Sequence, residues 1–344
     1  MKEEGALAKY ILKRLGYLVV VFFIVSLLMY MLYNLIPSDP ARDQLEGLKS
    51  TLKPEEYQQM YANLRKQMGL DDHILIRYAR WMGLIPNMEG KFYGLLEGNF
   101  GFSQYFKKNV IEVVVEPLKT TIFINIFATI LALGITIPLG IYCAVHKGGK
   151  IDNFTQVFTI IGYSIPVYII ALVFIFIFAV LLRWFPVSGM GTPGASYTGL
   201  RLWLDRLYYF ALPLIVMTFG SLGGMTRYVR AAMIDALSMD HIKTARAKGV
   251  KEKAVIYSHA WRNALLPVVT LIISWFLGIF SGSVIIENTF NINGMGSLYI
   301  KGLNNHDYEL ALAIQMFYTV VSLVGALIMD LSYGIVDPRV HIDK

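Results

Sequence analysis

Long uncharged stretches dominate the hydrophobic pattern of this chain. Six of them contain at least 20 residues without Asp, Glu, Lys or Arg. They span Leu15–Ile36, Thr120–Val145, Asn153–Leu182, Leu207–Thr226, Asn263–Ile286 and Leu310–Met329. About 20 apolar residues in a helix cross the hydrocarbon core of a bilayer, which is roughly 30 Å thick. The pattern therefore predicts an all-α polytopic membrane protein with six transmembrane helices.

The first uncharged stretch follows three basic residues, as the h-region of a signal peptide does. It is 22 residues long, however, and no A-x-A cleavage site follows it. Signal h-regions are shorter, with about 7 to 15 apolar residues. We therefore expect this stretch to stay in the protein as transmembrane helix one.

The positions of the basic residues predict the orientation of the six helices. Sixteen Lys and Arg residues lie before helix one, in the connections 146–152 and 227–262, and in the C-terminal tail. Connections 183–206 and 287–309 hold only three and one. Segment 37–119 has eleven basic and eleven acidic residues and is too long to decide orientation. Because cytoplasmic loops are enriched in Lys and Arg, we expect both termini in the cytoplasm and segment 37–119 outside.

The segment after helix one has the pattern of a small helical unit. Pro54, Glu55 and Glu56 are typical of a first helical turn. Apolar residues then share one face before Gly69, namely Tyr57, Met60, Tyr61, Leu64 and Met68. A second helix is expected after Asp71 or Asp72, carrying Ile74, Arg77, Tyr78 and Trp81. We therefore divide the chain into 1–36 (cytoplasmic N-terminus and helix one), 37–119 (extracytoplasmic helical segment) and 120–344 (five-helix core with cytoplasmic loop 227–263).

Composition excludes several classes of function. With 56% hydrophobic and 16% charged residues, the chain does not resemble a cytosolic enzyme. Its single cysteine, Cys143, cannot form an internal disulfide. The net charge of +7 follows from basic residues retained on one side of a membrane, so we expect lipid and no nucleic acid as a partner. Glycine pairs Gly220/Gly224 and Gly278/Gly282 would let helices approach closely, although such spacings are common in helical bundles.

Sites for energy conversion or catalysis are missing from the sequence. The nearest approach to a phosphate-binding loop, 148–151, lacks the earlier glycine and the hydroxyl residue that holds magnesium. The uncharged stretches contain no histidine, and the six histidines lack zinc-site spacing. Ser164 lies beside Pro166, as expected of a helix kink rather than a nucleophile. Two alternatives remain: a self-sufficient channel or carrier, and an intramembrane enzyme. Either would need acidic, basic or histidine residues within the membrane, and the uncharged stretches have none.

The connection between helices four and five carries the most specific pattern. We expect Asp240 to cap a helix over 241–248 that ends at Gly249 in a left-handed conformation. A second helix should begin near Lys251 and carry Ala254, Tyr257, Ser258 and Trp261 on one face. Pro267 would then start the next membrane helix. The alternative is that the basic residues of this connection have no binding role and only follow the positive-inside rule.

Two neighbouring motifs favour a specific family. They are Thr244-Ala245-Arg246-Ala247-Lys248-Gly249-Val250 and His259-Ala260-Trp261-Arg262-Asn263-Ala264-Leu265-Leu266-Pro267. Together they resemble the cytoplasmic signature loop of permease subunits of binding-protein-dependent ABC importers, of the oligopeptide and dipeptide type. Lys243-Thr244-Ala245 stands where the general signature has Glu-Ala-Ala, as in the peptide subclass.

Further short motifs extend the resemblance along nearly the whole chain. They are Pro37-Ser38-Asp39-Pro40, Met68-Gly69-Leu70-Asp71 with Arg77-Tyr78, Gly98-Asn99-Phe100-Gly101-Phe102-Ser103, Trp184-Phe185-Pro186 and Asp337-Pro338-Arg339. Ser38 stands where the family commonly has glycine. In this order the motifs resemble the first of that family's two permeases.

The resemblance implies the type I ABC importer permease fold and a set of partners. These are a second homologous permease, two cytoplasmic ABC ATPases, an extracytoplasmic solute-binding protein and a peptide substrate. The chain itself would be no enzyme and bind no cofactor or metal, because ATP and Mg would be held by the ATPases. It would lie in a bacterial or archaeal cell membrane, as a multi-pass protein.

The resemblance also implies where the ATPases are contacted. The expected coupling residues are Asp240, Ile242, Thr244, Ala245, Arg246, Ala247, Lys248, Gly249 and Val250. We expect Ala245 and Ala247, with Ile242 or Val250, to supply packing. Arg246 or Lys248 would pair with acidic groups of the ATPase.

Overall fold

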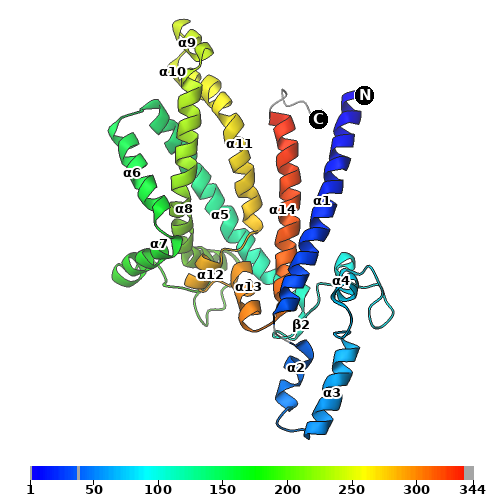
Figure 1. Ribbon diagram of the computed structural model, residues 1–344. Coiled ribbons are helices and arrows are strands. Elements are labelled where there is room, and N and C mark those ends of the chain that lie inside the picture. The colour runs from blue at the N-terminus through cyan, green and yellow to red at the C-terminus, as the bar shows by residue number, and fades with distance from the viewer. Residues whose placement is uncertain (1, 37–38, 337–344) are drawn as a thin grey trace. The chain divides into compact units, whose positions relative to one another are not determined.

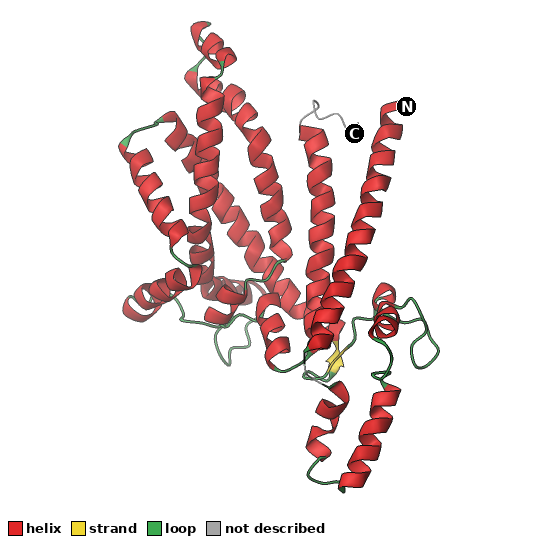
Figure 2. Ribbon diagram, viewed as in Figure 1, coloured by secondary structure: helices red, strands yellow, loops and turns green. Residues whose placement is uncertain are grey.

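The computed structural model describes residues 2–36 and 39–336, and its regular structure is almost wholly helical (Figure 1, Figure 2). The α-helices are α1 (Lys2–Leu35), α2 (Pro40–Leu45), α3 (Pro54–Gln67), α4 (Ile74–Met82), α5 (Val110–Val145), α6 (Lys150–Ser164), α7 (Val167–Phe174), α8 (Gly199–Ser238), α9 (Asp240–Ala247), α10 (Glu252–Ala254), α11 (Trp261–Leu277), α12 (Val284–Thr289), α13 (Met295–Asn304) and α14 (Tyr308–Val336). The 3₁₀ turns are η1 (Glu46–Leu48), η2 (Leu95–Glu97) and η5 (Gly278–Phe280), and the π turns are η3 (Ile175–Leu181) and η4 (Val255–Ala260). One antiparallel ribbon pairs β1 (Phe102–Ser103) with β2 (Lys108–Asn109). The all-α prediction is confirmed.

Among the described residues, five helical segments are long and apolar enough to cross a membrane. They are Lys9–Leu35, Val110–Val145, Gly199–Ser238, Glu252–Phe280 and Tyr308–Ser332. The third predicted span is instead a helix pair, Lys150–Ser164 and Val167–Leu181, bent by 104°. The six predicted spans thus correspond to five continuous helices and one bent pair.

The bend between α6 and α7 has a local cause. Ile165 is extended (φ −87°, ψ 128°), because a residue before proline is disfavoured in the helical region. Pro166 then begins a new direction without a backbone N–H to continue the helix. Ser164 Oγ donates a hydrogen bond to the carbonyl of Ile160 (2.8 Å), one turn earlier in α6. The predicted kink is confirmed.

The chain divides into two compact units, of which the first comprises Met1–Tyr10, Leu118–Ser297 and Val324–Lys344. Two hydrophobic clusters in this unit share α8. One joins α8 to α5, α7 and α12, with Leu212 and Val216 fully buried. The other joins α8 to α5, α9 and α11, with Val229 and Met233 fully buried. Helix α8 is therefore the central packing element of this unit.

Close helix approach in this unit uses different glycines from the predicted pairs. A Cβ added at Gly223 would lie 2.7 Å from the Thr159 carbonyl of α6. A Cβ at Gly140 would lie 2.8 Å from the Val229 side chain. At Gly224 and Gly278 a Cβ would meet no atom within 4 Å. The sequence left open whether these glycine pairs mark close contacts, and within the described residues neither Gly224 nor Gly278 does, because glycine spacing does not reveal which helix face is buried.

The connection after α11 is more structured than a short loop. It contains α12 and α13, and the carboxylate of Glu287 lies buried between them. Glu287 accepts hydrogen bonds from Thr121 Oγ1 (3.0 Å) and from the backbone N–H of Ser297 (2.8 Å). The N–H of Met295 donates to Thr121 Oγ1 (2.8 Å). This network joins α12 and α13 to α5.

The second unit comprises Ile11–Pro117 and Leu298–Leu323. Helices α3 and α4 form where the sequence predicts, and α3 begins with Pro54 in its first turn. The core of this unit contains Tyr30, Tyr78, Met82, Leu312 and Met316. Ser26 Oγ lies 2.7 Å from Tyr78 OH, which joins α1 to α4 through a buried hydrogen bond.

The ribbon in the second unit, which the sequence pattern does not indicate, is held to α14. Ser103 Oγ donates a hydrogen bond to Asp307 Oδ2 (2.5 Å), and the N–H of Tyr105 donates to the same oxygen (3.2 Å). The Asp307 side chain is buried and also accepts from the N–H of Leu310 at the start of α14. One carboxylate therefore caps a membrane helix and positions the ribbon.

Candidate coupling site

Helix α8 continues beyond the predicted fourth span and supports the candidate coupling site. The uncharged stretch ends at Thr226, but α8 runs on to Ser238. Its buried face in this extension is Val229, Met233 and Ala236. Met239 is extended (φ −64°, ψ 146°), and α9 begins immediately after it, at the end of α8 (Figure 1).

Asp240 does not cap α9 as the sequence predicted. The residue in the N-cap position is Met239, and Asp240 is the first helical residue. Its carboxylate accepts a hydrogen bond from Lys243 Nζ (2.9 Å), and both side chains are exposed. The predicted cap is wrong because the extended residue between α8 and α9 lies one position earlier than the pattern indicated. The negative charge of Asp240 still stabilises the N-terminus of α9 through the helix dipole.

Gly249 ends α9 in the predicted left-handed conformation. Its φ is 76°, a region that side chains other than glycine rarely adopt. The N–H of Gly249 donates to the carbonyl of Arg246 (3.0 Å), and the N–H of Val250 donates to that of Ala245 (3.2 Å). These two bonds satisfy carbonyls in the last turn of α9, as glycine-terminated helices commonly do.

The second helix expected after Gly249 and the fifth membrane span are one continuous element. Residues Glu252–Phe280 form a single helical span, and Pro267 lies inside α11. The prediction that Pro267 starts a new helix is therefore wrong. The π turn η4 widens the helix by one residue, so its buried face is Val255 and Ala260. Of the four residues predicted to share one face, Tyr257 and Ser258 are exposed, whereas Ala254 and Trp261 are half-buried.

The expected coupling residues divide into an inner and an outer group. Ile242 is 0% exposed and packs in the cluster that contains Met233 and Val255. Ala245 and Val250 are half-buried against the same cluster. The exposed members are Asp240, Thr244, Arg246, Ala247, Lys248 and Gly249. Ile242 therefore anchors α9 to the helices of this chain and lies away from the outer face.

Charges at the site are arranged on its exposed side. Arg246 Nη2 lies 2.7 Å from Glu252 Oε1, and both side chains are exposed. The hydrogen bond to Glu252 raises the pKa of Arg246. Among the described residues, no carboxylate lies within ion-pair distance of Lys248. Asn263 Nδ2 lies 3.3 Å from His241 Nε2, which links α9 to α11.

A buried ion pair below the site joins α6 to α8, and sequence reasoning missed it. Asp152 is 1% exposed and Arg230 is 20% exposed. Arg230 Nε and Nη2 donate to the two carboxylate oxygens of Asp152 at 2.6 and 2.7 Å. The N–H of Gly148 donates to Asp152 Oδ2 (2.9 Å), so the turn before α6 joins the same network. The signal available in the sequence was one acidic residue in the basic connection 146–152.

Two family descriptions match the chain. "Binding-protein-dependent transport system inner membrane component" matches residues 136–342. The description of the N-terminal part of such membrane components matches residues 7–125. The first match includes the whole candidate coupling site. Of the short motifs, Pro37, Ser38 and 337–339 lie outside the described residues.

Curated relatives are similar over nearly the full length. The oligopeptide transport system permease protein AppB of Bacillus subtilis (strain 168) is 33% identical and covers 97% of this chain and 100% of the relative. The dipeptide transport system permease protein DppB of Lactococcus lactis subsp. cremoris (strain MG1363) is 31% identical, covering 98% and 100%. The glutathione transport system permease protein GsiC of Salmonella paratyphi A (strain ATCC 9150 / SARB42) is 29% identical, covering 96% and 98%. This chain therefore belongs to the family of membrane-embedded permease components of binding-protein-dependent ABC importers.

Proposed function

We propose that this chain is the permease subunit of an ATP-driven importer of peptides and forms one half of the translocation pathway. The observation that carries the proposal is the similarity, over 97% and 98% of the chain, to permeases named for oligopeptides and dipeptides. A third relative is named for glutathione, which is itself a short peptide. The substrate class common to these names is a peptide of a few residues.

The proposed assembly contains four further protein subunits. A second homologous permease completes the pathway, two cytoplasmic ABC ATPases bind ATP and Mg, and an extracytoplasmic solute-binding protein delivers the peptide. The family description, which names dependence on a binding protein, supports this composition. The present chain holds neither nucleotide nor metal in the proposal.

The proposed orientation places both termini and α9 in the cytoplasm. Sixteen basic residues then lie on the cytoplasmic side, in accordance with the positive-inside rule. Segment 37–119, with α2, α3 and α4, lies outside. The cell membrane of a bacterium or archaeon is the expected location.

In this proposal, α9 transmits the nucleotide state of the ATPases to the membrane helices. Asp240, Thr244 and Ala247 recur at a spacing that puts them on one exposed face. Ala247 and Gly249 permit close approach, and Lys248 provides a charge that has no ion-pair partner in the part of the chain that the structure describes. Ile242 couples α9 to α8. Contacts that differ between the two nucleotide states would then bias the equilibrium between inward-facing and outward-facing arrangements.

Reconstitution in proteoliposomes tests the function directly. The chain alone should neither hydrolyse ATP nor accumulate a labelled tripeptide under an ion gradient. Uptake should appear only when the second permease, both ATPases, the binding protein and ATP are all present. Gradient-driven accumulation by the chain alone would overturn the proposal.

A further inference from the structure

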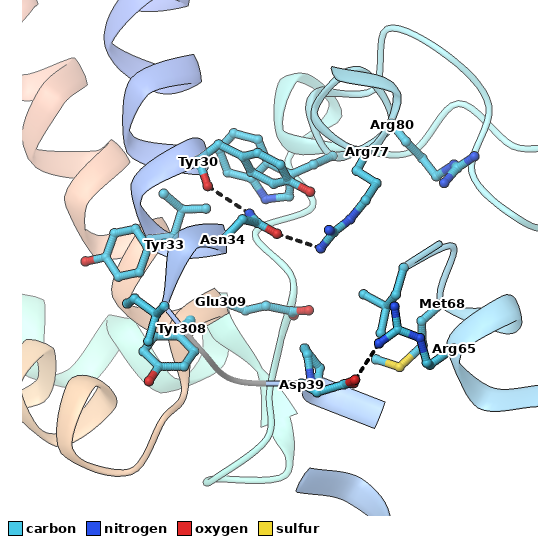
Figure 3. Close-up of a pocket in the computed structure, with 15 residues that line it drawn as sticks. Tyr30, Tyr33, Asn34, Asp39, Arg65, Met68, Arg77, Arg80, Tyr308 and Glu309 are labelled. Carbon is cyan, nitrogen blue, oxygen red and sulfur yellow. Dashed lines mark hydrogen bonds and ion pairs between the residues drawn. The ribbon is translucent and has the colours of Figure 1, made fainter. Parts of the chain in front are cut away.

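A pocket of about 410 Å³ opens in the second unit, between α1, α4 and the start of α14. Figure 3 shows the charged and aromatic side chains that surround it. Its volume lies in the range of small-molecule sites, roughly 300 to 1,000 Å³. Its polar groups come from elements that are distant in the sequence, and they face a common space.

Three of the five charged residues that line the pocket already have ionic partners. Arg65 Nη1 lies 2.5 Å from Asp39 Oδ2, and Tyr61 OH also donates to this carboxylate. Burial raises the pKa of Asp39, but the hydrogen bonds from Tyr61 and Arg65 outweigh it and hold the pKa below its usual value. Arg80 pairs with Asp72 at 2.8 Å. These charges stabilise the wall and leave little attraction for a ligand.

Of the five charged residues that line the pocket, Arg77 and Glu309 have no ionic partner among the described residues. Arg77 Nη2 donates to the neutral amide oxygen of Asn34 (2.5 Å). Glu309 Oε2 accepts one hydrogen bond from the N–H of Phe102 (2.8 Å). The Glu309 side chain is surrounded by protein atoms yet accessible to solvent, as expected of a residue on a pocket wall. Figure 3 shows its carboxylate pointing into the space between Arg77 and Arg65.

Aromatic side chains form the rest of the wall. Tyr30 and Trp81 have ring centroids 5.2 Å apart, and those of Tyr33 and Tyr308 are 6.2 Å apart. Leu312 lies behind them, buried in the core of the unit. Such a wall accepts hydrocarbon or a peptide plane, while the two unpaired charges select the polar ends of a ligand.

We propose that this pocket binds a small zwitterion with a free ammonium group and a free carboxylate, such as an amino acid or a short peptide. The ammonium pairs with Glu309, and the carboxylate forms a two-pronged hydrogen-bonded pair with Arg77. A simple anion is disfavoured by Glu309 and Asp39, and a simple cation by Arg65, Arg77 and Arg80. Only a ligand with both charges compensates both unpaired groups.

This inference rests on the charges of the pocket and stands independently of the transport proposal. Binding, rather than uptake, is therefore its readout. The purified full-length chain is placed in phosphatidylcholine nanodiscs and titrated with trialanine by isothermal calorimetry. Trialanine should bind, whereas N-acetyl-trialanine and trialanine amide should each bind at least tenfold more weakly.

Variants assign each end of the ligand to one side chain. Arg77→Gln and Glu309→Gln should each weaken trialanine binding at least tenfold, while Lys66→Gln on the exposed side of α3 should not change it. Glu309→Gln should have no further effect on the N-acetylated peptide, and Arg77→Gln none on the amide. A matched elution volume and melting temperature for each variant exclude misfolding as the cause.

Two results would overturn the inference. One is equal binding of trialanine and its two blocked forms, which would show that the unpaired charges do not select the ligand. The other is failure of trialanine to bind. If phosphatidylethanolamine occupies the pocket of such a sample, the ammonium and phosphate of a lipid headgroup are the ligand instead.

Discussion

Arg230 on α8 holds the buried carboxylate of Asp152 on α6 with two hydrogen bonds, of 2.6 and 2.7 Å. The two residues are 78 positions apart in the chain. Paired geometry of this kind fixes the orientation of both side chains as well as their distance. The ion pair therefore fixes α6 to the end of α8 that precedes α9. A movement of α9 would then act on α6 and α8 together.

Removal of Arg230 should be costly. Arg230→Met leaves the Asp152 carboxylate buried with only neutral donors, and breaking a buried pair in this way costs about 3 to 5 kcal/mol. Asp152→Asn in the same chain should recover part of that loss. The free energy of unfolding in mixed micelles measures both effects. Arg227→Met, at an exposed position on the same helix, is the matched control. An equal loss of unfolding free energy in Arg230→Met and Arg227→Met would contradict the assignment.

Two adjacent glycines on α8 should respond in opposite ways to alanine. At Gly223 the new methyl group would meet the Thr159 carbonyl at 2.7 Å, so Gly223→Ala should destabilise the protein by about 1 to 3 kcal/mol. At Gly224 the methyl group meets nothing within 4 Å. Gly224→Ala should therefore stabilise α8 slightly, by up to about 1 kcal/mol. Thermal unfolding of the two variants in detergent compares them, and similar melting temperatures would disprove the contact.

Gly249 should be needed for its conformation rather than for its size. A Cβ there meets no atom within 4 Å, but the φ of 76° is unfavourable for a β-branched residue. Gly249→Val should cost about 1 to 2 kcal/mol or redirect α9, and so reduce ATPase binding and peptide uptake together. Gly249→Asn, which tolerates this φ better, should retain more of both. Wild-type uptake and ATPase recovery in Gly249→Val would exclude Gly249 from the coupling site.

The outer face of α9 can be tested without disturbing its packing. Ala247 is exposed, so Ala247→Asp should leave membrane abundance and pairing with the second permease unchanged while reducing co-purification of the ATPases. Ala245→Asp is unsuitable, because Ala245 packs against the core of its own chain. Lys253→Gln, also exposed, is the control and should have little effect. Undiminished ATPase recovery in Ala247→Asp would place the contact elsewhere.

Cysteine labelling tests the orientation. Cys143 is buried and is first replaced by alanine. Gln59 on α3 and Ser258 in the π turn are both exposed and accept cysteine. Gln59→Cys should react with an impermeant maleimide on intact cells, and Ser258→Cys only after permeabilisation. The reverse labelling pattern would invert the proposed topology.

Most features that depend only on residues adjacent in the sequence were predicted correctly. The uncharged stretches mark the spans because a bilayer selects length and polarity segment by segment. Pro54 starts α3, Pro166 breaks the third span, and Gly249 ends α9, since each restricts or permits backbone angles at its own position. The role of the exposed α9 residues in coupling stays a prediction.

The predictions were wrong where a helix boundary shifts by one residue or where the buried face of a helix had to be identified. Asp240 lies one position inside α9 because Met239, and not Asp240, is extended. Pro267 stays within α11, and the π turn at Val255–Ala260 changes the face that an ordinary helical period would bury. A helical wheel drawn from sequence assumes a constant period, so it cannot place this face correctly.

The class of the protein, its membrane-spanning segments and its family could be predicted without a structure, because they follow from local hydropathy and from motifs of contiguous residues. Tertiary structure decided which residues meet. It brought Arg230 to Asp152, selected Gly223 over its neighbour Gly224 for close approach, and placed Arg77 and Glu309 at one pocket. The physical reason is that pairing and close packing depend on how helix faces are turned toward each other, which is a property of the whole packed arrangement.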